Sequence, residues 1–379
     1  MPKVFDRRLK GRLAKFLPAL CICALTIQCF GQEQLTLSKP IHLLWAFETN
    51  DMSNITPTLT EEAIYVPLAN GMIVSVKTEN GELLWRSEMG GRISASPYSD
   101  SKGVYVASES VPLKSRSPQV SGALRALSPR NGVTLWVHTL PTPMRGALTA
   151  NGTTLFGGTA DGRVYALNKE TGETVWVKYN SSPFNSSPVL YGGNLYIGDE
   201  EGKIIVIEQA TGKTLWHYRT RKAVRAPVSI FEGAVYVGST DGSVYFLEEA
   251  TGRLKRRVST NASVQSVQEA GKCLLVTSLD NFVYCLSPQH GEKIWKRRLA
   301  GRIVARPLVL RESVLLPPLF GDECVVLNLQ DGKTVNTIFV GEDNNAEASP
   351  LFTENLLLLP TRKGLLAFSS REAKAATQE

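Results

Sequence analysis

Short runs of alternating apolar and polar residues, separated by turn residues, extend from about residue 35 to residue 371. The segment from Asn194 to Trp216 is representative. Asn194–Gly198 and Ile204–Ile207 are two short runs that we interpret as strands, Glu201-Gly202 forms a tight turn between them, and Thr211-Gly212 leads into a further strand containing Trp216. A period of two predicts strands rather than helices. With the preceding run from Ser186 to Leu190, this segment predicts four strands in about 40 residues.

A Gly followed four residues later by a Trp recurs along the chain and sets a longer period. Two equivalent positions carry Arg256 and Asn336 in place of Trp, and Trp45 is in phase without the Gly. These eight positions are separated by 40, 51, 40, 40, 40, 39 and 41 residues. All six Trp residues fall in this register: Trp45, Trp85, Trp136, Trp176, Trp216 and Trp295. A fixed period of this length indicates a repeat architecture.

Four strands per period, repeated eight times, predict an all-β fold: an eight-bladed β-propeller of four-stranded antiparallel blades. The C-terminal region provides only three strands, so we expect residues 41–48 to supply the outer strand of the last blade and close the ring. Residues 35–371 then form one domain, followed by a polar tail over 372–379. The Trp side chains are expected to dock between blades, with looser contacts where Arg256 and Asn336 replace them.

The net charge of +7 is concentrated at the N-terminus of the 379-residue chain. Residues 1–31 hold six bases and one acid, and an apolar stretch from Phe16 to Ile27 follows the bases, as in a secretory signal peptide. Cleavage after Gly31 is expected; retention as an anchor and a lipid on Cys29 are the alternatives. The remaining charge of +2 argues against nucleic-acid binding.

The Ala166-Leu-Asn168 to Trp176 stretch resembles the repeat of propellers of the pyrroloquinoline-quinone type. The quinone-dependent dehydrogenases share that design, but their vicinal Cys-Cys pair is missing here. Cys273, Cys285 and Cys324 have no metal-ligand spacing and predict no disulfide framework, and Cys285 is expected to be a small packed residue. We therefore expect no catalytic site, no cofactor and no metal, with a quinone enzyme as one alternative.

Within this class the chain is similar to the BamB family of the outer-membrane β-barrel assembly machinery. That family carries a Leu-x-Leu-Arg-Gly loop before an inner strand, where this chain has Thr142-Pro-Met-Arg-Gly146. The resemblance implies that Arg145 binds a protein partner and that Met144 makes an apolar contact beside it. Pro183 and Asn185 replace two Asp residues of the family's next loop. The implied protein is a monomeric, exported scaffold at the periplasmic face of the outer membrane, whose partner is the barrel-inserting subunit; an exported sensor or ligand-binding propeller is the other alternative.

The loops that precede the inner strands carry five Arg residues from different parts of the ring: Arg92, Arg145, Arg225, Arg302 and Arg306. In a propeller these loops gather around one mouth of the central channel, where guanidinium groups can receive carboxylates from a partner. An insertion at 108–122 lies in a hairpin expected on the same side. Contact with a membrane is expected only indirectly or through a lipid on Cys29.

Overall fold

The computed structural model describes residues 35–110, 120–317, 321–346 and 348–370 of the chain. The expected leader over 1–31 with Cys29, the tip of the 108–122 insertion and the tail over 372–379 lie outside these ranges. Among the described residues, no helical segment has the length and hydropathy needed to span a bilayer.

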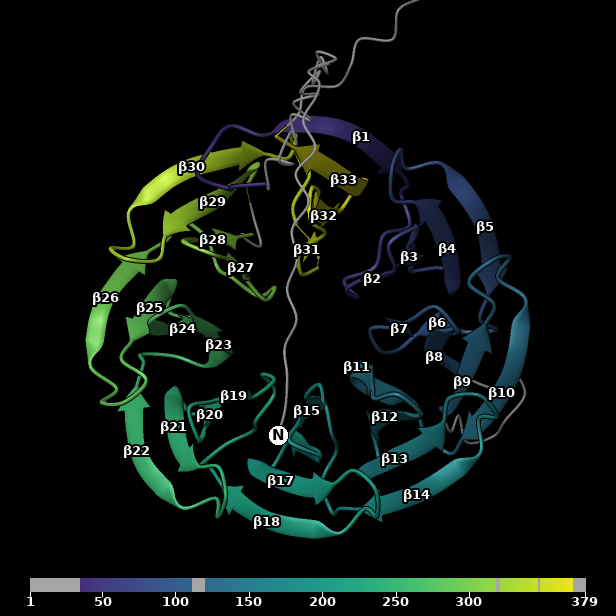
Figure 1. Ribbon diagram of the computed structural model, residues 1–379, viewed down its shortest axis with the longest axis horizontal. Helices are drawn as coiled ribbons and strands as arrows, with labels where there is room; N and C mark the ends of the chain where they lie inside the picture. Colours follow the sequence, from purple (N-terminus) through teal and green to yellow (C-terminus); the bar gives the residue numbers. More distant parts are fainter. Residues whose placement is uncertain (1–34, 111–119, 318–320, 347, 371–379) are drawn as a thin grey trace, which may run out of the picture. The chain divides into compact units, whose positions relative to one another are not determined.

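Eight antiparallel sheets, each of four main strands, stand around a central axis as the blades of a propeller (Figure 1). This confirms the predicted fold class. The sheets of the first four blades in chain order contain β2 (Thr58–Leu59), β3 (Ala63–Pro67), β4 (Met72–Lys77) and β5 (Leu83–Glu88); β6 (Arg92–Ile93), β7 (Tyr98–Ser99), β8 (Val104–Ser110), β9 (Ser121–Leu127) and β10 (Thr134–Leu140); β11 (Met144–Ala150), β12 (Thr154–Thr159), β13 (Arg163–Asn168) and β14 (Thr174–Tyr179); and β15 (Val189–Tyr191), β16 (Asn194–Gly198), β17 (Lys203–Glu208) and β18 (Thr214–Arg219).

In the next three blades the strands again run in chain order from the inner to the outer strand. In the last blade the outer strand is β1 (His42–Glu48), from the N-terminal part of the domain. These four blades contain β19 (Ser229–Phe231), β20 (Ala234–Ser239), β21 (Ser243–Glu248) and β22 (Leu254–Ser259); β23 (Val264–Ala270), β24 (Cys273–Ser278), β25 (Phe282–Leu286) and β26 (Lys293–Arg298); β27 (Leu308–Leu310), β28 (Ser313–Leu316), β29 (Glu323–Asn328) and β30 (Thr334–Phe339); and β31 (Leu351–Phe352), β32 (Leu357–Thr361), β33 (Gly364–Ser369) and β1.

The ring closes where β1, from the N-terminal part of the domain, pairs antiparallel with β33 near the C-terminus (Figure 1). Trp45 lies opposite Ala367 in this pairing. Leu35 and Leu37, which precede β1, are buried in a cluster with residues of the last two blades. The predicted closure by the N-terminal strand is therefore confirmed.

The hydrophobic core is divided into eight clusters, one at each junction between neighbouring blades. Middle strands such as β3 and β20 are buried along their whole length, because blades cover both of their faces. The outer strands are largely exposed, and strands such as β18 alternate between partly covered and exposed positions. The sequence shows this difference as continuous apolar runs in the middle strands and alternation in the outer ones.

Six of the eight blade junctions are fastened by an indole that lies on a glycine of the next blade. Trp216 is representative: its N–H donates to the carbonyl of Glu249 at 2.9 Å, and a Cβ on Gly252 would lie 2.3 Å from its ring. Four other indoles bond in the same way to a carbonyl three residues before the matching Gly. The Gly and the Trp of the sequence repeat therefore serve different junctions.

The two positions without Trp are filled by other means. The aliphatic stem of Arg256 packs on Gly291, where a Cβ would lie 2.8 Å from its Cδ atom. The Tyr236 hydroxyl donates to the carbonyl of Pro288, which is the position that accepts from an indole at the Trp junctions. Asn336 donates through Nδ2 to the carbonyls of Leu37 and Lys39, at 3.0 and 2.9 Å. The looser contact expected at Asn336 is not observed, because that amide holds the segment leading into β1.

Candidate functional site

One end of the ring carries the loops that precede the inner strands together with the hairpins between the second and third strands of each blade. Both sets lie at the same end because successive strands of a blade run in opposite directions. We call this end the Arg-bearing face, because Arg92, Arg145, Arg225 and Arg302 lie on these loops or at the first residues of the strands they enter. Two of these bases, Arg145 and Arg225, form ion pairs with acids of a neighbouring blade.

Arg145 is positioned by the residues on either side of it at the start of β11. Met144 is only 1% exposed and lies against Gly157, where a Cβ would come within 2.7 Å of its sulfur. Gly146 has a φ of +70° and passes close to the carbonyl of Ser186, so only glycine fits there without strain. Met144 is thus a core residue rather than the surface contact expected from the sequence, since its side chain alternates inward when that of Arg145 points outward.

The Arg145 guanidinium forms an ion pair with Glu109, with 2.7 Å between Nη2 and Oε2. Glu109 lies near the end of β8, in the preceding blade. Both side chains are partly accessible, at 31% and 20%. The pair therefore bridges two blades at a place that a partner can reach.

Arg225 makes a second ion pair, with Glu200. This pair joins the loop before β19 to the hairpin between β16 and β17 of the preceding blade. The Nε of Arg225 lies 2.9 and 3.0 Å from the two oxygens of Glu200, and its Nη2 lies 2.7 Å from Oε2. Asn185 donates to the same carboxylate at 2.8 Å. The Arg225 hydrogen bond holds the pKa of Glu200 below its usual range, and Glu200 raises the pKa of Arg225. Asn185, where the resembling family has an acid, here supports an acid from the neighbouring hairpin.

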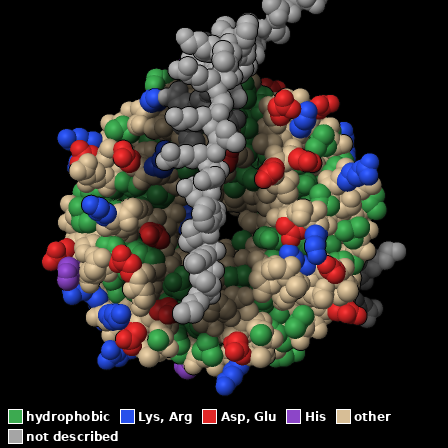
Figure 2. Space-filling model, in the orientation of Figure 1, with side chains coloured by type: hydrophobic (Ala, Val, Ile, Leu, Met, Phe, Trp, Pro, Cys, Tyr) green, Lys and Arg blue, Asp and Glu red, His purple; other side chains and the backbone are tan. Residues whose placement is uncertain are grey.

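Arg306 lies in the wall of the central channel. Its Nε donates to Gln268 Oε1 at 3.1 Å, and its backbone N–H donates to Ser349 Oγ at 3.0 Å. Protein atoms around this guanidinium displace part of its hydration and lower its pKa below the ordinary value, although the side chain remains exposed to the channel. The channel forms a cavity of about 730 Å³ lined by residues of all eight blades, and Figure 2 shows its opening at the centre of the ring.

Arg92 and Arg302 are exposed, and neither makes an ion pair with an acid in the described part of the chain. Of the five Arg residues predicted to gather at one mouth, two are paired with acids of a neighbouring blade, one lies in the channel wall, and two are exposed without an ion pair among the described residues. Glu109 and Glu200 could not be recognised as partners from the sequence. They lie 36 and 25 residues before their Arg, so no local pattern joins them.

The two cysteines of β24 and β25 are joined as a disulfide, which corrects the expectation of an unpaired, packed Cys285. Leu275 lies opposite Cys285 in the hairpin, so Cys273, two residues earlier, is its diagonal neighbour on the same face. Cys324 is buried and free. Spacing motifs do not detect such a pair, because a hairpin and not a ligand loop brings the two residues together.

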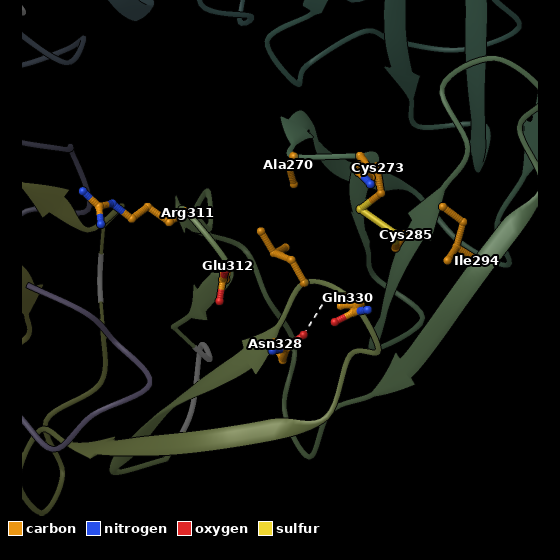
Figure 3. A pocket seen from close by; sticks show the side chains of 11 residues that line it. Ala270, Cys273, Cys285, Ile294, Arg311, Glu312, Asn328 and Gln330 are labelled. Atoms are coloured by element: carbon orange, nitrogen blue, oxygen red, sulfur yellow. Dashed lines mark hydrogen bonds between the residues drawn. A yellow bond between two sulfur atoms is a disulfide. The ribbon is translucent and has the colours of Figure 1, made fainter.

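The disulfide forms part of the wall of a pocket of about 530 Å³ at the end of the ring opposite the Arg-bearing face. Figure 3 shows Cys273, Cys285 and Ile294 on one side and Asn328 on the other, with the Arg311 side chain extending away from them. Among the described residues, no group of three or more His, Cys, Asp or Glu side chains is arranged to hold a metal ion.

Comparison with protein families gives a match to the family described as outer membrane protein assembly factor BamB, over residues 120–268 and 257–378. No curated protein sequence matches the chain.

Among solved structures, BamB from Moraxella catarrhalis is similar with a TM-score of 0.71 at 16% identity, covering 88% of this chain and 98% of that one. The computationally designed protein Ika8 gives 0.72 at 14% identity, covering 86% and 99%. The quinohemoprotein alcohol dehydrogenase from Comamonas testosteroni gives 0.73 at 11% identity, covering 92% and 79%. At these identities the three structures establish the shared propeller fold.

Proposed function

The chain belongs to the family described as outer membrane protein assembly factor BamB, and from this premise we propose that it is an exported scaffold that binds a protein partner in the assembly of outer-membrane β-barrel proteins. The proposed partner is the barrel-inserting subunit. The proposed binding surface is the Arg-bearing face, with Arg145 at its centre and Arg92, Arg225 and Arg302 around it. The leader over 1–31 delivers the propeller to the periplasm, with a lipid on Cys29 as the alternative form of attachment.

The observation that carries this proposal is the partly accessible ion pair of Arg145 and Glu109, which bridges two blades. A guanidinium held in place by a buried neighbour and an adjacent glycine is already oriented, so a partner carboxylate can approach it with little loss of side-chain entropy. Glu109 keeps the charge compensated in the free protein and can be replaced by, or shared with, an acid of the partner. Arg225 with Glu200 repeats the arrangement farther round the face.

Capture from cell envelopes tests the proposal. We expect tagged wild-type protein to co-purify with the barrel-inserting subunit, and Arg145→Glu to reduce the recovered subunit at least about tenfold, as for a buried or semi-buried charge pair at an interface. Arg253→Glu is the matched control, because Arg253 also pairs with an acid, Glu248 at 3.5 Å, but at the opposite end of the ring. Thermal unfolding of all three proteins establishes that they fold alike.

Failure to recover any barrel-assembly subunit with wild-type protein would contradict the proposed pathway. Equal recovery with Arg145→Glu would remove Arg145 from the binding surface while leaving the pathway intact. We propose no enzymatic activity, and turnover of an alcohol by the purified protein supplied with pyrroloquinoline quinone and calcium would contradict that part of the proposal.

A further inference from the structure

Seven Lys and Arg residues lie on the outer strands of two adjacent blades, β22 and β26, which stand side by side at the lower left and left of Figure 1. We call them the basic band: Lys255, Arg256, Arg257, Lys293, Lys296, Arg297 and Arg298. Neither strand contains an acid. The other six outer strands together carry only Arg86, Lys178 and Arg219.

The basic band carries far more positive charge than the net charge of the rest of the domain would suggest. Residues 32–379 contain 36 bases and 34 acids, so the part of this region outside the band has 29 bases and 34 acids and is net negative. Seven like charges on two neighbouring strands repel one another, and this repulsion is a cost to the folded protein. A concentration of one sign on an otherwise acidic domain therefore indicates a surface that meets negative charge.

The side chains of the band are accessible and are not tied up in ion pairs among the described residues. Six of the seven are exposed, and Arg297 is half-buried, donating to the carbonyls of Asp331 and Gly332 at 2.8 Å each. In the part of the chain that the structure describes, no band residue lies within ion-pair distance of a carboxylate. Lys293 and Lys296 instead lie over the rings of Tyr284 and Phe282, at 5.6 and 4.5 Å, which steadies their stems without removing their charge.

Arg256 shows that charge is favoured over packing at this place. It occupies the position that holds a docked Trp in most other blades, and its guanidinium remains exposed. Exchange of a buried indole for an exposed base gives up junction packing and adds a positive charge in the middle of the band. Departures from a local rule of this kind are typical of functional surfaces.

Two apolar side chains lie among the bases, Leu254 on β22 and Ile294 on β26, with 41% and 53% of their surface exposed. The combination of long basic side chains with exposed aliphatic ones on a convex rim suits an extended negative surface into which aliphatic groups can be pressed. The band differs from the way in which this protein binds a single carboxylate. There, Arg225 donates through Nε and Nη2 to the two oxygens of Glu200, and no aliphatic contact is needed.

We propose that the basic band docks on an anionic phospholipid membrane, with its Lys and Arg side chains at the lipid phosphates and Leu254 and Ile294 between the headgroups. This contact is made through the rim, so it leaves the Arg-bearing face open to a protein. It does not depend on the proposed function, because purified protein and lipid are sufficient to form it.

Sedimentation with vesicles tests the proposal on the folded domain beginning at Leu35. We expect binding to vesicles of phosphatidylcholine with one third phosphatidylglycerol, no binding to phosphatidylcholine alone, and release by high salt. Lys255→Glu with Arg298→Glu should lower the vesicle affinity at least about tenfold, because each base near an anionic surface adds to the attraction. Arg86→Glu with Arg219→Glu reverses the same number of charges on outer strands of other blades and should change the affinity less than about twofold.

Absence of binding to the anionic vesicles, or equal loss in the band variant and the control variant, would overturn the proposal. A photoreactive residue at position 255 in living cells should form adducts with lipid. Adducts with an acidic protein and none with lipid would assign the band to that protein instead and would equally overturn the membrane assignment.

Discussion

At the scale of single residues, the junction between blades depends on a Trp and a Gly that belong to different blades. The indole needs a flat, close approach, and glycine provides it because it has no Cβ. Gly252 also has a φ of +70°, a conformation that other residues adopt only with strain. Five indoles add a hydrogen bond to a carbonyl of the next blade.

Alanine substitutions at Gly233 and Gly252 distinguish the cost of backbone strain from the cost of a steric clash with an indole. Gly233 has a φ of +67° and nothing within 4 Å of where a Cβ would lie, whereas a Cβ on Gly252 would lie 2.3 Å from the Trp216 ring. Gly233→Ala should lower the free energy of unfolding by about 1 kcal/mol through backbone strain alone. Gly252→Ala should lower it by about 3 kcal/mol, because displacement of the indole is added. Urea denaturation of both variants measures the difference, and equal losses would contradict the role given to the Trp216 contact.

Some residue roles follow from the sequence and others do not. The Trp positions could be predicted, because a large side chain at a fixed period has few uses other than packing between repeats. The burial of Met144 could not be predicted. It depends on the irregular strand pairing after Arg145 and on the space that Gly157, which has no side chain, leaves for the Met144 sulfur. The disulfide between Cys273 and Cys285 depends on the register of the hairpin. A slip of one residue would turn one cysteine to the other face of the sheet and prevent the bond.

At the scale of elements, strand order was predictable but strand length was less so. Asn194–Gly198 is a strand with the expected bounds. The run from Ser186 to Leu190 is a strand only from Val189 onward, and β15 ends at Tyr191. Pro188 has no N–H to offer a ladder, and Ser186 instead donates its hydroxyl to the carbonyl of Ala226 across the channel wall.

The closing strand β1 gives a prediction at this scale. A chain beginning at Leu35 should unfold in one cooperative transition, whereas a chain beginning at Asp51 lacks β1, loses the Trp45 contact with Gly81 and exposes the edge of β33. Loss of the Trp45 side chain alone should lower the free energy of unfolding by at least about 3 kcal/mol. The bare edge should also cause association that increases with concentration. Equal denaturation midpoints for the two chains, with both remaining monomeric in light scattering, would show that β1 does not close the ring.

At the scale of the whole molecule, the eight blades separate the chemistry into distinct surfaces. The Arg-bearing face carries two bases paired with acids of neighbouring blades and two bases without an ion pair in the described part of the chain. The channel wall holds Arg306, the opposite end has the pocket beside the disulfide, and the rim carries the basic band. The repeat predicted that such surfaces exist, because a ring has two ends and a rim. Which bases are compensated depends on acids from other blades, and that information appears only in the folded ring.

Photo-cross-linking in living cells tests the central claim, the use of the Arg-bearing face, most directly. A photoreactive residue is placed at Arg92 or Arg302, two exposed bases of that face that make no ion pair in the described part of the chain, and at Lys213 or Lys333, exposed positions at the opposite end. We predict adducts with the barrel-inserting subunit of the outer membrane from positions 92 and 302 and none from positions 213 and 333. Adducts formed from the opposite end alone, or no adduct with that subunit from any of the four positions, would contradict the account.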